Sequence, residues 1–74
     1  MRVKNIGANM AEVAIERATI LFSYETPVAC CMNDGTGFFK TNKKWSSTTS
    51  RHINKWLLGA KAKEMPQSFF DNLL

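Results

Sequence analysis

The sequence has no acidic residue between Lys40 and Lys63, a stretch that holds seven lysine and arginine side chains. It also has no apolar run near the roughly 18 residues of a membrane-spanning helix, which excludes a segment of that kind. Only four glycines and two prolines occur, and 45% of the residues are hydrophobic, so the composition is not that of a disordered chain. Because 74 residues bury one core only, we expect a single domain over residues 1–74.

Cysteine and histidine are equally scarce. Cys30 and Cys31 are adjacent, and neighbours on an extended strand point to opposite faces, so we expect free thiols, with Cys30 in the core. Free thiols, together with the lack of an N-terminal signal pattern, predict a cytoplasmic location. Two cysteines and His52 are too few for a zinc site, and no nucleophile, base and orienting acid can be assembled. We therefore expect no enzyme, no metal and no cofactor.

Four segments of the first half have the patterns of β-strands, at residues 11–16, 19–24, 28–32 and 38–41. The first alternates apolar and polar residues, and the second is rich in β-branched and aromatic residues. Between the third and the fourth, Asn33-Asp34-Gly35-Thr36-Gly37 tolerates the positive φ angles of a tight turn. The short connections predict a four-stranded antiparallel β-meander.

The second half has helical patterns. Hydroxyl side chains at residues 46–50 can accept hydrogen bonds from the free N–H groups of a first turn, and Gly59 favours termination. Pro66 predicts the start of a second helix that runs to the end of the chain. Its apolar contacts are Phe69, Phe70, Leu73 and Leu74. Both helices need an apolar surface, so we expect them on one face of the meander, in a two-layer α+β domain of order ββββαα.

The charge is unevenly divided. Residues 1–39 hold three basic and four acidic side chains, a net charge of −1, whereas residues 40–74 hold seven and two, a net charge of +5. Such asymmetry favours a polyanionic partner, either nucleic acid or an acidic protein surface. It does not favour a membrane or a small-molecule substrate.

The stretch most indicative of function combines cations, an aromatic residue and the predicted helix start. Phosphates bind at such places because free N–H groups and the helix dipole face them, and tryptophan can stack on an unpaired base. The predicted nucleic-acid- or partner-binding residues are Lys40, Lys43, Lys44, Trp45, Arg51, His52 and Lys55. In the alternative interpretation Trp45 covers the core, the hydroxyls only cap the helix and the lysines are solvated. His52, at the border of the buried helix face, has a structural, hydrogen-bonded role in that interpretation.

Several segments carry a resemblance to known proteins. They are Ser23-Tyr24-Glu25-Thr26-Pro27-Val28-Ala29, Lys44-Trp45-Ser46 and the run from Thr48 to Leu57 with the sequence TTSRHINKWL. Over most of its length the chain resembles a group of small bacteriophage and prophage proteins with no established activity. The resemblance implies a phage protein in the cytoplasm of a host cell, and it supplies no catalytic or binding residues.

Three functions fit these observations. We expect a small non-enzymatic accessory protein that binds nucleic acid through the basic residues around the first helix. The first alternative is a phage inhibitor that docks on a host protein, such as a CRISPR effector or a DNA-processing enzyme. The second is a structural homo-oligomer, for example a homodimer in which residues 69–74 pack across a two-fold axis.

Overall fold

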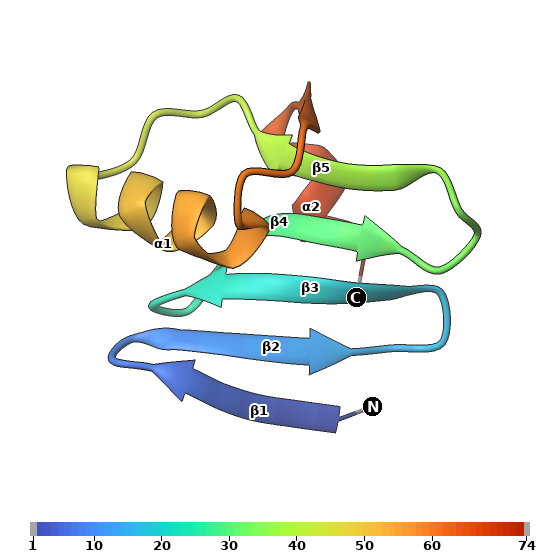
Figure 1. The fold of residues 1–74 in the computed structure, drawn as a ribbon, viewed down its shortest axis with the longest axis horizontal. Coiled ribbons are helices and arrows are strands. Elements are labelled where there is room, and N and C mark those ends of the chain that lie inside the picture. The colour runs from blue at the N-terminus through green and yellow to red at the C-terminus, as the bar shows by residue number, and fades with distance from the viewer. Residues whose placement is uncertain (1, 74) are drawn as a thin grey trace.

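The computed structural model describes residues 2–73, which form six strands and two short helices (Figure 1). The elements are β1 (Arg2–Gly7), β2 (Met10–Ala14), β3 (Ala18–Ser23), β4 (Thr26–Met32), β5 (Gly37–Thr41), α1 (Ser47–Leu57), β6 (Ala62–Met65) and α2 (Gln67–Asp71). No helix within these residues is both long and apolar enough to cross a membrane.

All six strands belong to one mixed sheet in the order β1-β2-β3-β4-β5-β6. The first five are antiparallel neighbours, and β6 pairs with β5 in parallel after the chain has crossed over through α1. The prediction of a four-stranded meander is therefore wrong, because its four segments correspond to β2–β5 and it lacks both outer strands. Edge strands often carry charged side chains, and polar residues such as Lys4 and Lys63 hide the alternation by which strands are identified.

The two helices lie on opposite faces of the sheet, which also corrects the predicted two-layer arrangement (Figure 1). Ile53 and Leu57 of α1 pack with Leu21 on one face, whereas Phe70 of α2 packs with Ile20 on the other. Neighbours on a strand point to opposite faces, and both Ile20 and Leu21 are fully buried. The fold thus has three layers, with the sheet in the middle.

A β-bulge in β4 places two consecutive residues in the apolar cluster beneath α1. Leu21 pairs with Ala29 and Phe22 with Pro27, so Val28 is the extra residue. Val28 and Ala29 both belong to the cluster that contacts α1. Pro27 has no N–H group to donate, and its position beside the bulge avoids the loss of a regular ladder bond.

Specific residues mark the ends of both helices. Ser46 caps α1, because its Oγ accepts a hydrogen bond of 3.2 Å from the Thr49 amide. Leu58 ends the helix in the left-handed conformation, with φ of 51°. The second helix ends at Asp71, and Leu74, which was expected to extend it, lies outside the described residues. Phe70 and Leu73 are buried against the chain's own sheet.

Candidate nucleic-acid interface

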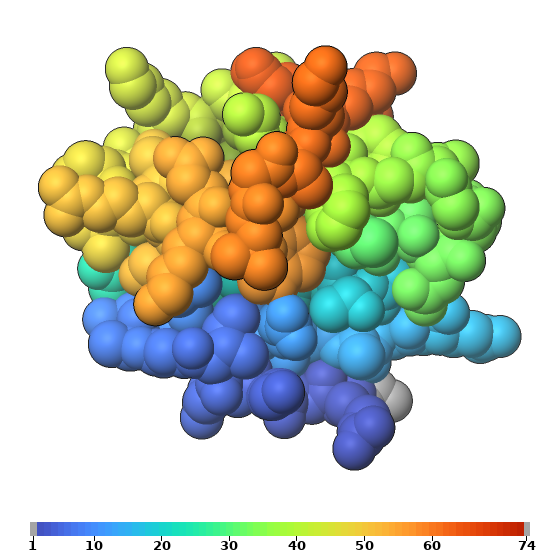
Figure 2. Space-filling model, viewed as in Figure 1, coloured from blue at the N-terminus to red at the C-terminus, as the bar shows by residue number. Residues whose placement is uncertain are grey.

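One row of paired residues crosses the sheet on the face that α1 covers. Its members, from β1 to β6, are Lys4, Glu12, Leu21, Ala29, Lys40 and Glu64. Paired residues of neighbouring strands share a face, and Leu21 and Ala29 pack beneath α1. Lys4 and Lys40 therefore emerge on the same face, on opposite sides of the helix. Figure 2 shows this face, on which β1 and β2 lie on one side of α1 and the segment after β5 lies on the other side.

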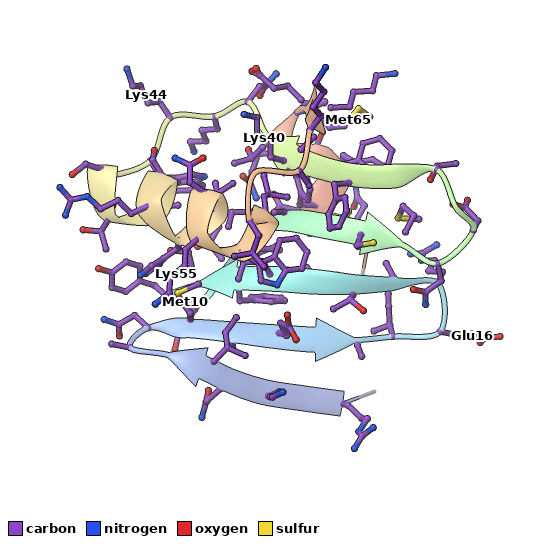
Figure 3. All side chains as sticks on the ribbon, viewed as in Figure 1. Met10, Glu16, Lys40, Lys44, Lys55 and Met65 are labelled. Atoms are coloured by element: carbon purple, nitrogen blue, oxygen red, sulfur yellow. The ribbon has the colours of Figure 1, made fainter. Side chains whose placement is uncertain are left out.

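A groove on the β5 side of α1 gathers three of the predicted lysines. It is lined by Lys40, Lys43, Lys44, Ser50, Asn54 and Glu64, among others. Figure 3 shows Lys40 and Lys44 on this side of the helix. The structure brings Lys40, Lys43 and Lys44 to one groove, because they are close along the chain and the segment turns from β5 into α1. Glu64 is the acidic residue of the groove, contributed by the parallel strand β6.

Arg51 and Lys55 are exposed on the outer side of α1. Figure 3 shows Lys55 on the flank that faces Met10, away from Lys44. Arg51 lies one turn before Lys55 and so occupies the same flank. The predicted cations thus form two groups, one on each side of α1, rather than one continuous patch. Lys4 and Arg2 extend the second group, because Arg2 pairs with Ala14 two positions from Lys4 on the same face.

The start of α1 favours anions. Its first turn contains no acidic residue, and the positive end of the helix dipole is preceded by Lys43 and Lys44. The hydroxyl-bearing residues Ser46, Ser47, Thr48 and Ser50 are exposed around this end. Lysines at the positive end of the dipole do not stabilise the helix. Helix stability therefore does not explain why Lys43 and Lys44 occur at this position.

His52 points into the domain instead of toward the cations. Its Nδ1 lies 2.8 Å from the Ser23 hydroxyl, which lies 3.0 Å from the Thr49 hydroxyl. Ser23 and Thr49 are buried, and the ring of Tyr24 lies 5.9 Å from the His52 ring. This polar cluster attaches α1 to β3, which agrees with a structural role for His52. Ser23 follows Leu21 on the inward side of β3, and that alternation is the signal by which it could have been found.

Trp45 lies at the edge of the domain beside the start of α2. Its indole N–H donates a 3.2 Å hydrogen bond to the Gln67 side chain, and the Lys43 ammonium lies 4.2 Å from the centre of its ring. The ring is 39% exposed. One face of the ring thus already has a cation–π partner, and a stacked base would have to replace Lys43 or use the other face. Sequence reasoning missed Gln67, which also donates to the Pro27 carbonyl at 2.7 Å.

A second tryptophan fixes an acidic side chain beneath α1. The Trp56 indole N–H donates a 2.6 Å hydrogen bond to Glu12, which is half-buried. Glu12 is the acidic residue between Lys4 and the helix in the cross-strand row. The other acidic residues of the described chain, apart from Glu64, lie in the turns after β2, β3 and β4 or at the end of α2. The α1 face is thus the more basic of the two.

Comparison with known proteins places the chain in a family. A family model described as "Family of unknown function (DUF8033)" matches residues 1–72. The chain belongs to DUF8033. Searches of curated proteins and of solved structures found no match. The description of DUF8033 names no activity, so a function has to be argued from the geometry above.

The thiols of this DUF8033 chain are both free, and Cys30 is buried as predicted. Burial, reinforced by the neighbouring Cys31, raises the pKa of the Cys30 thiol to about 11. Such a thiol stays protonated at neutral pH and is a poor nucleophile. Among residues 2–73 no group of three histidine, cysteine or acidic side chains is arranged to hold a metal ion.

Proposed function

We propose that this chain binds nucleic acid through the face of the sheet that α1 covers. The observation that carries the proposal is the cross-strand row in which Lys4 and Lys40 flank the helix. Lys43 and Lys44 extend the row on one side, and Arg51 and Lys55 add cations on the helix itself. Phosphate contacts from such residues supply most of the affinity of nucleic-acid-binding proteins, independently of sequence.

The proposal makes a quantitative statement about salt. If the four lysines beside α1, Lys4, Lys40, Lys43 and Lys44, each neutralise one phosphate, the log–log slope between affinity and salt concentration is about −4 on duplex and about −3 on single strands. Fluorescence anisotropy with labelled duplex and single-stranded probes between about 50 and 200 mM salt measures this slope. Affinity that does not change with salt, or no binding at tens of micromolar protein, would contradict the proposal.

Single substitutions on the two sides of α1 test the site itself. Lys4→Ala and Lys44→Ala each remove one exposed cation, from β1 and from the segment before α1. Each substitution should make the slope shallower by about 1. Lys63→Ala is the matched control, because Lys63 is exposed but pairs with Phe39, whose side chain packs on the α2 face. Equal losses for all three variants would mean that net charge alone is being measured.

The setting is a further part of the proposal. The resemblance to phage and prophage proteins supports a role in the cytoplasm of an infected host cell. A protein partner is the second candidate, and one observation favours it. Leu58 is 87% exposed at the end of α1, three residues after Lys55, and the buried core of a protein interface is more apolar than the rest of a protein surface. An affinity pull-down from nuclease-treated host lysate separates the two, because only a protein partner survives the nuclease.

A further inference from the structure

We infer that the nucleic acid is double-stranded and that α1 enters its major groove, with Arg51, Asn54 and Lys55 against the base edges. This inference rests on the proposed function and names the ligand class and the orientation for the same face. Three observations support it. They are the row of exposed residues on the outer side of α1, the spacing of the cations across the sheet and the chemistry of the exposed side chains.

The outer side of α1 is a continuous exposed stripe. Ser47, Arg51 and Asn54 follow one another at positions i, i+4 and i+7, which places them along one side of the helix, and Leu58 follows at the helix end in the left-handed conformation. All four are exposed, and Lys55 lies beside them. The opposite side of the helix carries Thr49, Ile53 and Leu57, which are buried against the sheet. The stripe therefore lies on the exposed side of the helix, with Arg51 toward the flank that faces Met10 and Asn54 toward the groove that holds Lys40 and Lys44.

The dimensions suit a groove. Lys4 and Lys40 are four strands apart in the same row, and strands lie about 4.8 Å apart, so the two positions are separated by roughly 19 Å. The major groove of B-form DNA is about 12 Å wide and admits one α-helix. A helix in the groove, with cations about 19 Å apart on its two sides, brings the cations to the two phosphate backbones that border the groove.

The side chains on the stripe have the chemistry of base recognition. Arginine bonds with two donors to guanine, and asparagine bonds to adenine through its amide. Leu58 offers an apolar contact of the kind that a thymine methyl group accepts. By contrast, His52 and Trp56, on the side of the helix near β2 and β3, already have partners, since His52 is hydrogen-bonded to Ser23 and Trp56 to Glu12.

Two features favour a duplex over a single strand. Trp45, the predicted stacking residue, lies off the stripe, with Gln67 on its N–H group and Lys43 over its ring. The second feature concerns the two acidic residues of the row, Glu12 and Glu64. Glu64 lies beyond Lys40 on the edge strand β6. The Glu12 carboxylate lies between Lys4 and the helix in the row, but it already accepts a hydrogen bond from the Trp56 indole.

Selection of binding sites from a pool of random duplexes, followed by anisotropy on the selected and a scrambled duplex, tests the inference. Two variants leave charge unchanged, Asn54→Ala and Arg51→Lys. Each should lower the preference for the selected over the scrambled duplex by roughly 5- to 150-fold, the equivalent of one bidentate base contact. The salt slope should stay the same for both variants. Lys44→Ala is the control, because it should weaken binding to both duplexes equally and make the slope shallower by about 1.

The outcomes separate this inference from the proposed function. If the pool yields no preferred sequence, if single strands bind as tightly as duplex, or if both variants keep the full preference, the groove-binding inference is wrong while salt-dependent binding stands. If no nucleic acid binds at all, both fail. Circular dichroism guards against misfolding, and substitutions at exposed sites such as these should change stability by no more than about 0.5 kcal/mol.

Discussion

The two faces of the sheet are stabilised by different kinds of side-chain contact. On the α2 face, Phe39, Phe69 and Phe70 form an aromatic cluster in which successive ring centres lie 5.5 and 5.2 Å apart. On the α1 face, an apolar cluster that includes the Phe38–Trp56 ring pair is supplemented by side-chain hydrogen bonds, between Ser23 and His52 and from Trp56 to Glu12. The comparison teaches that one face serves mainly to stabilise the domain, whereas the other holds a helix in a fixed orientation with its charged side outward.

The largest effect should come from the α2 face. Phe70→Ala removes a fully buried ring, which typically costs about 3–5 kcal/mol. A domain of this size has a core worth only roughly that amount, so the variant should be largely unfolded at 25 °C. Urea denaturation followed by circular dichroism measures the loss. Leu58→Ala on the other face is the control, since Leu58 is 87% exposed and its truncation should cost no more than about 0.5 kcal/mol. Similar losses in the two variants would erase the distinction between the faces.

A smaller effect is expected where α1 is attached. Ser23→Ala removes the hydroxyl that meets both Thr49 and His52, and a buried polar group left without its partner costs about 1–3 kcal/mol. The same urea experiment should show that loss, together with weaker nucleic-acid binding as the helix loses its fixed orientation. Ser47→Ala is the matched control, because it deletes an exposed hydroxyl of the same helix. A Ser23 variant as stable as the Ser47 variant would show that packing alone holds α1.

The buried thiol predicts a modest dependence on pH. Burial raises the pKa of Cys30 from the ordinary 9.0 to about 11, so the folded protein keeps a proton that the unfolded chain releases. Unfolding therefore becomes easier as the pH rises from about 9 to about 11, and below pH 9 the group has no effect. Urea titrations across this interval should show falling stability, and Cys30→Ala should remove this part of the fall. An unchanged slope in that variant would assign the effect to other groups.

The sequence predicted the middle of the sheet well and its borders poorly. Strands β2–β5 and helix α1 have strong periodic patterns, and the structure has elements in all these places. The two-face arrangement was also detectable, because Ile20-Leu21-Phe22 is an unbroken apolar run, and such runs indicate a strand covered on both sides. The strands β1 and β6 were not detectable in this way, since solvent contact at an edge permits charged residues.

The candidate site was likewise only partly predictable from the sequence. Lys40, Lys43 and Lys44 could be grouped from the sequence because they are neighbours along the chain. Lys4 could not, because its place opposite Lys40 depends on the register of four successive strand pairs. A shift of one residue in any pair would move it to the other face of the sheet.

The smallest predicted effect concerns the one acidic side chain of the groove. Glu64 pairs with Lys40 and lines the groove that also holds Lys43 and Lys44, so its carboxylate repels a phosphate bound there. At a separation of about 8 Å in water the repulsion is roughly 0.5 kcal/mol, and Glu64→Gln should therefore tighten binding about twofold. The gain should shrink as salt rises above about 0.15 M. Glu16→Gln changes the net charge equally but lies in the turn after β2, at the end of the sheet away from α1 (Figure 3). If anisotropy shows the same gain for Glu16→Gln, the field of the whole protein governs binding, and the contrast between the faces does not extend to the ligand.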